Sequence, residues 1–240
     1  MAKLSVNINK IATLRNARGE NNPDVLKMAL LIESLGADGI TVHPRPDQRH
    51  IRNDDIYNLK NHLKVELNIE GYPTADFISL CNDIKPAQIT LVPDPPDVIT
   101  SNDGFKLIDD DDFDLVKNAI KALTPSGARV SIFIDPIDFL SGNGEIIKAT
   151  GTDRIELYTQ AYARDYRNAD ILARYQSLAA RVHKLGLGVN AGHDLSLDNL
   201  SPFLKALPEI NEVSIGHALI CDALILGMAE TIKRYKAASV

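Results

Sequence analysis

Three histidines, His43, His193 and His217, end or directly follow short apolar runs that are typical of buried β-strands. Histidine is the side chain whose unperturbed pKa lies near neutral pH, so it can both accept and donate protons there. One such histidine alone more often has a structural role. Three of them at strand ends indicate general acid/base chemistry, because barrel enzymes place their active sites at the carboxyl ends of their strands.

Polar residues that alternate with apolar ones inside the same runs indicate which side of each strand faces the site. These residues are Glu66, Asn68, Glu70 and Glu156, with Asn7 and Asn9 in the first run. Because alternate residues of a strand point to opposite faces, we expect this set to face the interior of the sheet. A carboxylate is costly to bury unless it is paired, so a purely structural row is unexpected, although Glu66 could form a salt bridge.

Glycines and arginines predict sites for phosphate. Gly192 and Gly216 follow the last two runs, where barrels often hold a phosphate on backbone N–H groups and a helix N-terminus. The loops after the first two runs contain His50 and four arginines: Arg15, Arg18, Arg45 and Arg49. Arginine can bind phosphate through two hydrogen bonds, although a surface ion pair is the simpler expectation for Arg15. Two arginine-bearing loops and one glycine site predict two anion pockets, as two phosphorylated substrates would require.

Other histidines and both cysteines have simpler interpretations. His62 and His183 lie in helical stretches, and no His-x-His or His-Glu-x-x-His spacing favours a metal site. Cys81 and Cys221 are too few for a disulfide framework. Both occur in apolar, helix-like contexts, so we expect them to be small core residues.

Eight short apolar runs, each followed by a longer amphipathic stretch, predict the elements that position these side chains. The runs span residues 4–8, 39–43, 65–70, 88–92, 129–134, 154–157, 188–190 and 212–215. Their spacing leaves room for one strand, one helix and two loops in each repeat. We therefore predict an α/β fold, a closed (β/α)8 TIM barrel that residues 1–240 form as a single domain.

Turn and cap residues support this division of the chain. Asn22-Pro23 and Asn53-Asp54 have the residue types of helix starts. Four glycines fall just before predicted strands, where a helix is expected to end in a left-handed cap: Gly36, Gly127, Gly151 and Gly186.

Composition restricts the class of protein. The 240 residues carry a formal net charge of −6, which argues against nucleic acid or an anionic membrane as a partner. Hydrophobic residues make up 45% of the chain, enough for a sizeable core, and no segment approaches the length of a membrane span. The residues at the start lack the apolar run of a signal peptide, so we expect a cytoplasmic enzyme.

Several motifs, in order along the chain, resemble one family. They are VNINKIATLRNARG at 6–19, GADGITVH at 36–43, RHI at 49–51, NIE at 68–70, VNAGH at 189–193 and IGHA at 215–218. These motifs resemble pyridoxine 5′-phosphate synthase. The resemblance implies a barrel with extra helices and a homo-octamer built as a tetramer of dimers. It also implies condensation of 1-deoxy-D-xylulose 5-phosphate with 3-amino-2-oxopropyl phosphate, without a metal or an organic cofactor.

The resemblance also implies roles for individual residues. His43 and Glu70 would accept protons, His193 would donate one, and Glu156 would stabilise charged intermediates. The aminoketone phosphate would lie near Asn7, Arg18, the backbone of Asp194, Gly216 and His217. The sugar phosphate would lie near Asn9, Lys10, Arg45, His50 and Thr100.

Two places depart from the family pattern. Asn9-Lys10 stands where the family commonly has Asp-His, and Asp194 stands where it has glycine. Lys10 could hold the sugar phosphate, and a Schiff base on Lys10 is less expected because the substrate brings its own amine. The carboxylate of Asp194 should weaken an adjacent phosphate site unless it points away.

Two other functions remain open at this point. One is a different barrel enzyme that acts on a single sugar phosphate, such as an isomerase or an aldolase that uses Lys10. The other is a non-catalytic barrel that binds phosphorylated metabolites, for which the changes at Asn9, Lys10 and Asp194 are the only support.

Overall fold

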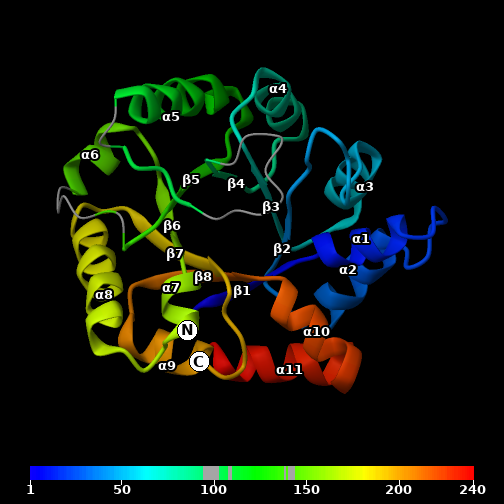
Figure 1. Ribbon diagram of the computed structural model, residues 1–240. Helices are drawn as coiled ribbons and strands as arrows, with labels where there is room; N and C mark the ends of the chain where they lie inside the picture. The colour runs from blue at the N-terminus through cyan, green and yellow to red at the C-terminus, as the bar shows by residue number, and fades with distance from the viewer. Residues whose placement is uncertain (94–102, 108–109, 138, 140–143) are drawn as a thin grey trace.

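The computed structural model describes residues 1–93, 103–107, 110–137, 139 and 144–240, and Figure 1 shows a closed ring of strands surrounded by helices. The eight strands are parallel and pair in chain order, and β8 pairs with β1. They are β1 Lys3–Asn7, β2 Gly39–Val42, β3 Glu66–Gly71, β4 Gln88–Leu91, β5 Arg129–Ile134, β6 Arg154–Tyr158, β7 Gly188–His193 and β8 Ile210–Ile215. Each coincides with a predicted run, so the predicted barrel is confirmed; β7 is longer than expected because it continues to His193.

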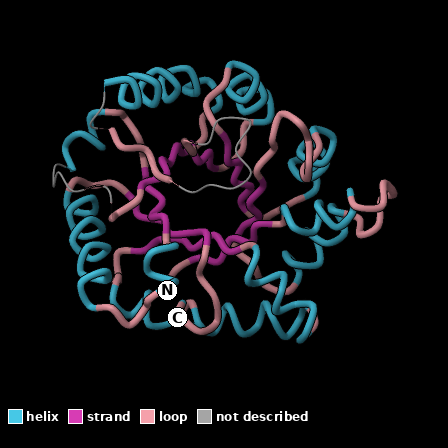
Figure 2. The backbone as a smooth tube through the Cα atoms, viewed as in Figure 1, coloured by secondary structure: helices cyan, strands magenta, loops and turns pink. Residues whose placement is uncertain are grey.

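At least one helix follows every strand and covers the outside of the barrel, as Figure 2 shows. Single helices follow five strands: α3 Asn53–His62, α4 Ala75–Ile84, α5 Asp110–Leu123, α6 Gly144–Ala149 and α9 Leu200–Ala206. A short 3-10 turn, η1 Thr124–Ser126, extends α5. Pairs of helices follow β1, β6 and β8: α1 Asn9–Asn16 with α2 Val25–Ser34, α7 Gln160–Arg164 with α8 Ala169–Lys184, and α10 His217–Leu226 with α11 Met228–Ala238. These pairs are the extra helices that the family resemblance implies.

Local signals located most helix ends but not the start of α2. That helix begins at Val25, and the carboxylate of Asp24 caps it by accepting the Lys27 N–H at 3.0 Å. The prediction of a start at Asn22-Pro23 was therefore wrong by two residues.

The four glycines predicted as left-handed caps all have positive φ, between 68° and 101°. Glycine adopts this conformation without the steric cost of a Cβ atom.

The barrel interior is polar, which is unusual because branched aliphatic side chains commonly fill such barrels. Gln88 on β4 donates to Glu212 on β8 at 3.3 Å and accepts from Asn190 on β7 at 3.4 Å. Strands β4, β7 and β8 are not all neighbours in the sheet, so these side chains meet inside the barrel. Asn68 on β3 also donates to the hydroxyl of Thr41 on the adjacent strand β2 and accepts from the hydroxyl of Thr90 on the adjacent strand β4. The alternation that the sequence predicted for β3 is confirmed.

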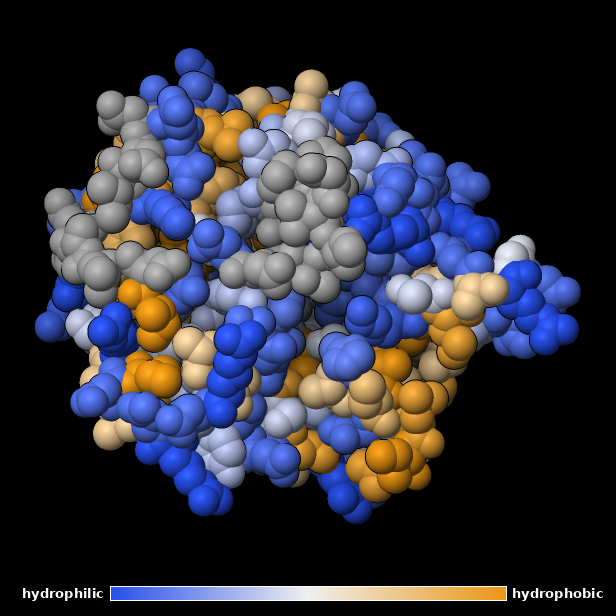
Figure 3. Space-filling model, in the orientation of Figure 1, coloured by the Kyte–Doolittle hydropathy of each residue, from blue (hydrophilic) through white to orange (hydrophobic). Residues whose placement is uncertain are grey.

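Helix α10 presents an exposed apolar face. Leu224 and Ile225 are 78% and 82% exposed, and Leu219 is the one buried residue of this helix. The face contributes to the orange area at the lower right of Figure 3.

Cys221 on this helix is exposed whereas Cys81 is buried, so the prediction that both cysteines lie in the core was wrong for Cys221. Within the described residues, no helix is long and apolar enough to cross a membrane.

Candidate active site

Asn7, the last residue of β1, connects three strands at their carboxyl ends. Its Nδ2 donates to Glu70 Oε2 of β3 at 3.3 Å, and its Oδ1 accepts the Asn9 N–H at 3.0 Å. Asn9 in turn accepts the backbone N–H of His43, just after β2, through Oδ1 at 3.0 Å. An amide oxygen accepts this N–H as a carboxylate oxygen would. The departure at Asn9 therefore preserves the connection between β1 and β2.

His43 and His50 form a pair of neutral imidazoles in an electropositive corner. Their ring centroids lie 6.3 Å apart. Burial, followed by the charges of Arg45 and Arg49, lowers the pKa of His43 well below its usual value of 6.5. Burial and the charges of Arg45, Arg49 and Lys10 lower the pKa of His50 to about 4. His43 is therefore unprotonated at neutral pH, as a proton acceptor must be.

The loop that carries His50 is held by the end of α1. Arg15 is only 1% exposed, pairs with Asp55 and donates to the His50 carbonyl at 3.0 Å. Asn16 Nδ2 donates to the same carbonyl at 2.8 Å. The expectation of a surface ion pair for Arg15 was wrong, because its side chain is buried between Asp55 in the first turn of α3 and the His50 carbonyl of the loop before it. Arg15 therefore fixes the position of the loop that carries His50.

Glu156 on β6 is a buried carboxyl group whose pKa is strongly raised. It is 3% exposed, and within the described part of the chain its Oε2 has no hydrogen-bond partner. Burial raises its pKa well above 4.5, and the negative charges of Glu70 and Glu212 raise it further. A carboxyl group of this kind holds its proton toward neutral pH.

An apolar wall beside Glu156 explains its burial and was missed by the sequence reasoning. Val92, Phe133 and Tyr158 form a small buried cluster separate from the main core. The Tyr158 ring packs against Phe133 at 5.2 Å and edge-on against His193 at 5.1 Å between ring centroids. The alternation that placed Glu156 inside the barrel continues to Tyr158 two residues later. This signal could have identified Tyr158.

His193 ends β7 with its ring held by its neighbour in sequence. Its Nδ1 lies 2.7 Å from Asp194 Oδ2, and its backbone has a φ of 99°, outside the regions that non-glycine residues prefer. The Asp194 N–H donates to Thr159 Oγ1 at 3.3 Å. The Asp194 carboxylate therefore points to the imidazole, and its N–H already has a partner.

The structure locates most of the remaining residues that were predicted to bind substrate, and one lies outside the described residues. A Cβ atom on Gly216 would lie 3.0 Å from Asn7 Cβ, so Gly216 packs directly on the Asn7 backbone and side chain. His217 begins α10, is exposed, and has its Nε2 3.6 Å from Cys221 Sγ. Arg18 is exposed in the turn after α1. Thr100 lies outside the described residues.

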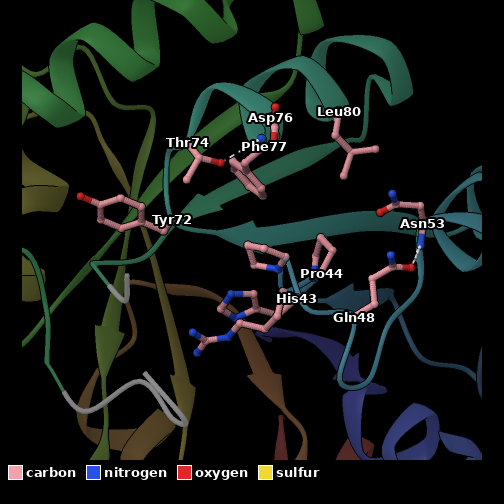
Figure 4. Close-up of a pocket in the computed structure, with 11 residues that line it drawn as sticks. His43, Pro44, Gln48, Asn53, Tyr72, Thr74, Asp76, Phe77 and Leu80 are labelled. Carbon is pink, nitrogen blue, oxygen red and sulfur yellow. Dashed lines mark hydrogen bonds between the residues drawn. The ribbon is translucent and has the colours of Figure 1, made fainter. Parts of the chain in front are cut away.

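A cavity of about 390 Å³ opens beside His43, between the loops after β2 and β3 (Figure 4). His43, Pro44 and Arg45 line one side, and Phe77 and Leu80 of α4 line the other. This volume falls in the range of small-molecule sites, which combine apolar walls with a few polar groups.

Among the described residues, no group of three or more His, Cys, Asp or Glu side chains could hold a metal ion.

Replacing Gly192 with alanine is expected to displace the Glu156 carboxylate. An added Cβ atom would lie 2.2 Å from Glu156 Oε1, a distance that forces the carboxylate to move. We expect a loss of about 1–3 kcal/mol in the free energy of unfolding, measured by chemical denaturation. A double-mutant cycle with Glu156→Ala provides the control, because removing the carboxylate should remove most of this cost. Strictly additive costs would contradict the close contact.

Solved structures with similar folds act on different substrates. Phosphoribosyl anthranilate isomerase from Thermococcus kodakaraensis has a TM-score of 0.62 at 10% identity, with 99% of this chain and 98% of that one covered. The YdjI aldolase from Escherichia coli has a TM-score of 0.60 at 12% identity, with 99% and 88% covered. At such low identity these similarities show the barrel fold alone.

Comparison of amino-acid sequences shows which enzymes the chain is related to. The chain is 54% identical to pyridoxine 5′-phosphate synthase of Porphyromonas gingivalis, with 98% of each chain covered. It is 55% identical to the enzyme of the same name from Parabacteroides distasonis, with 99% of this chain and 98% of the relative covered. The family model described as pyridoxal phosphate biosynthesis protein PdxJ matches residues 4–239. The chain belongs to this PdxJ family.

Proposed function

We propose that this chain is a pyridoxine 5′-phosphate synthase. It condenses 1-deoxy-D-xylulose 5-phosphate with 3-amino-2-oxopropyl phosphate and releases phosphate and water. Membership of the PdxJ family over residues 4–239 is the observation that carries this proposal. The strand ends also supply what the chemistry needs, an unprotonated imidazole at His43 and a proton-holding carboxyl group at Glu156.

Each chemical step requires proton transfer. The amine of one substrate forms an imine with the ketone of the other, and dehydration, phosphate elimination and ring closure follow. In our proposal His43 and Glu70 accept protons and His193 donates one. Glu156 stabilises cationic intermediates, because a positive charge that develops beside a buried carboxyl group favours its ionised form. Positioned acid/base groups of this kind typically contribute about 10²- to 10⁴-fold to a rate.

Each phosphate has a proposed location. The aminoketone phosphate lies at the N-terminus of α10, near Asn7, Gly216 and His217, with Arg18 and the backbone of Asp194. The positive end of the helix dipole and free N–H groups favour an anion there. The sugar phosphate lies near Asn9, Lys10, Arg45, His50 and Thr100. The charges of Arg45 and Lys10 that lower the pKa of His50 support this location.

In this proposal residues 1–240 form one catalytic domain. Copies of this domain assemble as a homo-oligomer, and the expected form is the octamer of the family. The exposed apolar face of α10 supports assembly, since exposed contiguous apolar patches commonly mark protein interfaces. Leu14 on α1 and Leu31 on α2 are also exposed, at 59% and 42%. Helix α10 lies beside α1 in Figure 1.

Replacing Ile225 with glutamate is expected to dissociate this oligomer. Ile225 is 82% exposed in the single chain, so the fold should tolerate a carboxylate there, whereas a buried interface would not. Light scattering should give a multiple of 26.3 kDa for the wild type and a smaller mass for the variant. Asn118→Glu, on exposed α5, adds the same charge and should leave the mass unchanged. A monomeric wild type would contradict the proposal.

Growth of a bacterial strain that lacks its own pyridoxine 5′-phosphate synthase tests the proposed activity. Expression of this chain should restore growth without added vitamin B6, and the His43→Asn variant should not. Failure of the wild-type chain to support growth, despite folded protein in the cells, would contradict the proposal.

A further inference from the structure

We propose that Asp194 is a positioning residue for His193, which it holds in the tautomer and orientation needed for proton transfer. The Asp194 carboxylate binds Nδ1 of the ring and thereby leaves Nε2 directed away from it. This inference deepens the proposed function, because it rests on His193 acting on the substrate.

The short contact between the two side chains determines the tautomer. His193 Nδ1 and Asp194 Oδ2 lie 2.7 Å apart. An ionised carboxylate can only accept hydrogen bonds, so the proton of this bond belongs to Nδ1. Nε2 is then the nitrogen open to a reacting group: it takes up a proton to form the imidazolium and donates that same proton to the substrate. Carboxylates that bind histidines of metal sites and catalytic triads fix the tautomer in the same manner.

The backbone on both sides of Asp194 is anchored, so the carboxylate has a fixed origin. The Asp194 N–H donates to Thr159 Oγ1 at 3.3 Å, and Thr159 Oγ1 donates to the Gly192 carbonyl at 2.7 Å. On the other side, Asn199 Nδ2 donates to the Asp194 carbonyl at 3.3 Å. These bonds connect the loop after β7 to the end of β6 and to the start of α9. The carboxylate is thereby held beside the ring.

Tyr158 restricts the imidazole on another side. Its ring meets His193 edge-on, with an angle of 85° between the ring planes. The positive φ of His193 is a conformation that non-glycine residues rarely adopt and that the surroundings must maintain. With one ring edge bound by Asp194 and the ring packed against Tyr158, the imidazole has little freedom to rotate. We conclude that Asp194 acts through His193 rather than on a phosphate.

Nitrogen NMR of histidine in the uncomplexed protein tests the tautomer directly, at a pH where the imidazole is neutral. Wild-type protein and Asp194→Asn should carry the His193 proton on Nδ1, because an amide oxygen can also accept it. Asp194→Ala should shift the population toward the Nε2–H tautomer. Asp198→Ala removes an exposed carboxylate of the same loop and should change nothing. An unchanged tautomer in Asp194→Ala would overturn the proposal.

Steady-state kinetics of the same variants provide the second readout. Loss of a residue that orients a catalytic group commonly costs about 10- to 100-fold, so Asp194→Ala should lower kcat by that amount. The KM values for both substrates should stay within about two-fold, because no ground-state contact is lost, and Asp194→Asn should recover most of the activity. A raised KM for the aminoketone phosphate with unchanged kcat would instead assign Asp194 to phosphate binding and overturn the inference. The NMR result needs no substrate, so it remains interpretable even if the proposed reaction is wrong.

Discussion

Replacing His43 with asparagine should lower kcat by about 10²- to 10⁴-fold, the usual contribution of a positioned general base. The asparagine amide cannot accept a proton from the substrate at accessible pH. Backbone contacts should survive, because Asn9 binds the backbone N–H of residue 43 rather than its side chain. Initial rates with both substrates at saturation measure the effect.

The pH dependence provides a second part of this prediction. Burial, followed by the charge of Arg45, lowers the pKa of His43, so this group loses its basic form only when the pH falls well below 6.5. If only the protonation of His43 is considered, wild-type activity should therefore persist at mildly acidic pH. His62→Asn, on the exposed side of α3, is the matched control and should retain full activity. A His43→Asn variant within a few-fold of the wild type would show that another group is the base.

Replacing Glu156 with glutamine should lower kcat by about 10²-fold, a typical cost of removing one group that stabilises developing charge. Glutamine has nearly the same shape, so the apolar wall at Phe133 and Tyr158 should remain packed. The same variant should be more stable than the wild type above mildly acidic pH, because it places no ionisable group in this buried position.

The sign of this stability effect follows from the raised pKa of Glu156. Above its unfolded value of 4.5 the unfolded chain releases the proton while the folded chain retains it, so wild-type stability is lost as the pH rises toward the folded pKa. Glutamine does not titrate, so the difference in Tm should grow in favour of Glu156→Gln as the pH rises above the unfolded value of 4.5. The exposed Glu20→Gln variant should show no such trend. A constant difference in Tm at all pH values would contradict the burial of a protonated Glu156.

The sequence predicted the barrel well, because alternation and spacing are local properties of the chain. In β3 and β6 a polar residue between two apolar ones was enough to place Glu70 and Glu156 inside the barrel. Strand ends were less certain: β7 continues past residue 190 because Ala191 packs outward while Gly192 makes room for Glu156. Nothing in residues 188–193 alone reveals the carboxylate on the neighbouring strand.

Contacts between remote segments were beyond the sequence signals. Arg15 was expected at the surface but is buried, because the closed barrel brings close to it Asp55 of α3 and the His50 carbonyl of the preceding loop. Cys221 was expected in the core but is exposed, because the apolar pattern of α10 does not distinguish burial in the core from an exposed face. The carboxylate of Asp194 was expected to weaken an adjacent phosphate site unless it points away; its contact with the His193 imidazole was not indicated by any sequence signal.

The fold itself does not select the reaction, since an isomerase and an aldolase have similar barrels. The alternative function of an aldolase depends on Lys10. This residue is exposed on α1, and its positive charge contributes to the low pKa of His50. A lysine that forms a Schiff base is commonly desolvated or placed next to another cation that activates its amine. Exposure of Lys10 therefore favours phosphate binding over covalent catalysis.

Product analysis tests the central claim most directly. The purified chain is mixed with 1-deoxy-D-xylulose 5-phosphate and 3-amino-2-oxopropyl phosphate, and pyridoxine 5′-phosphate and free phosphate are both quantified. We predict that both products form in equal amounts, and that neither forms when one substrate is omitted. Absence of pyridoxine 5′-phosphate above the uncatalysed background, with folded protein and both substrates present, would contradict the assignment.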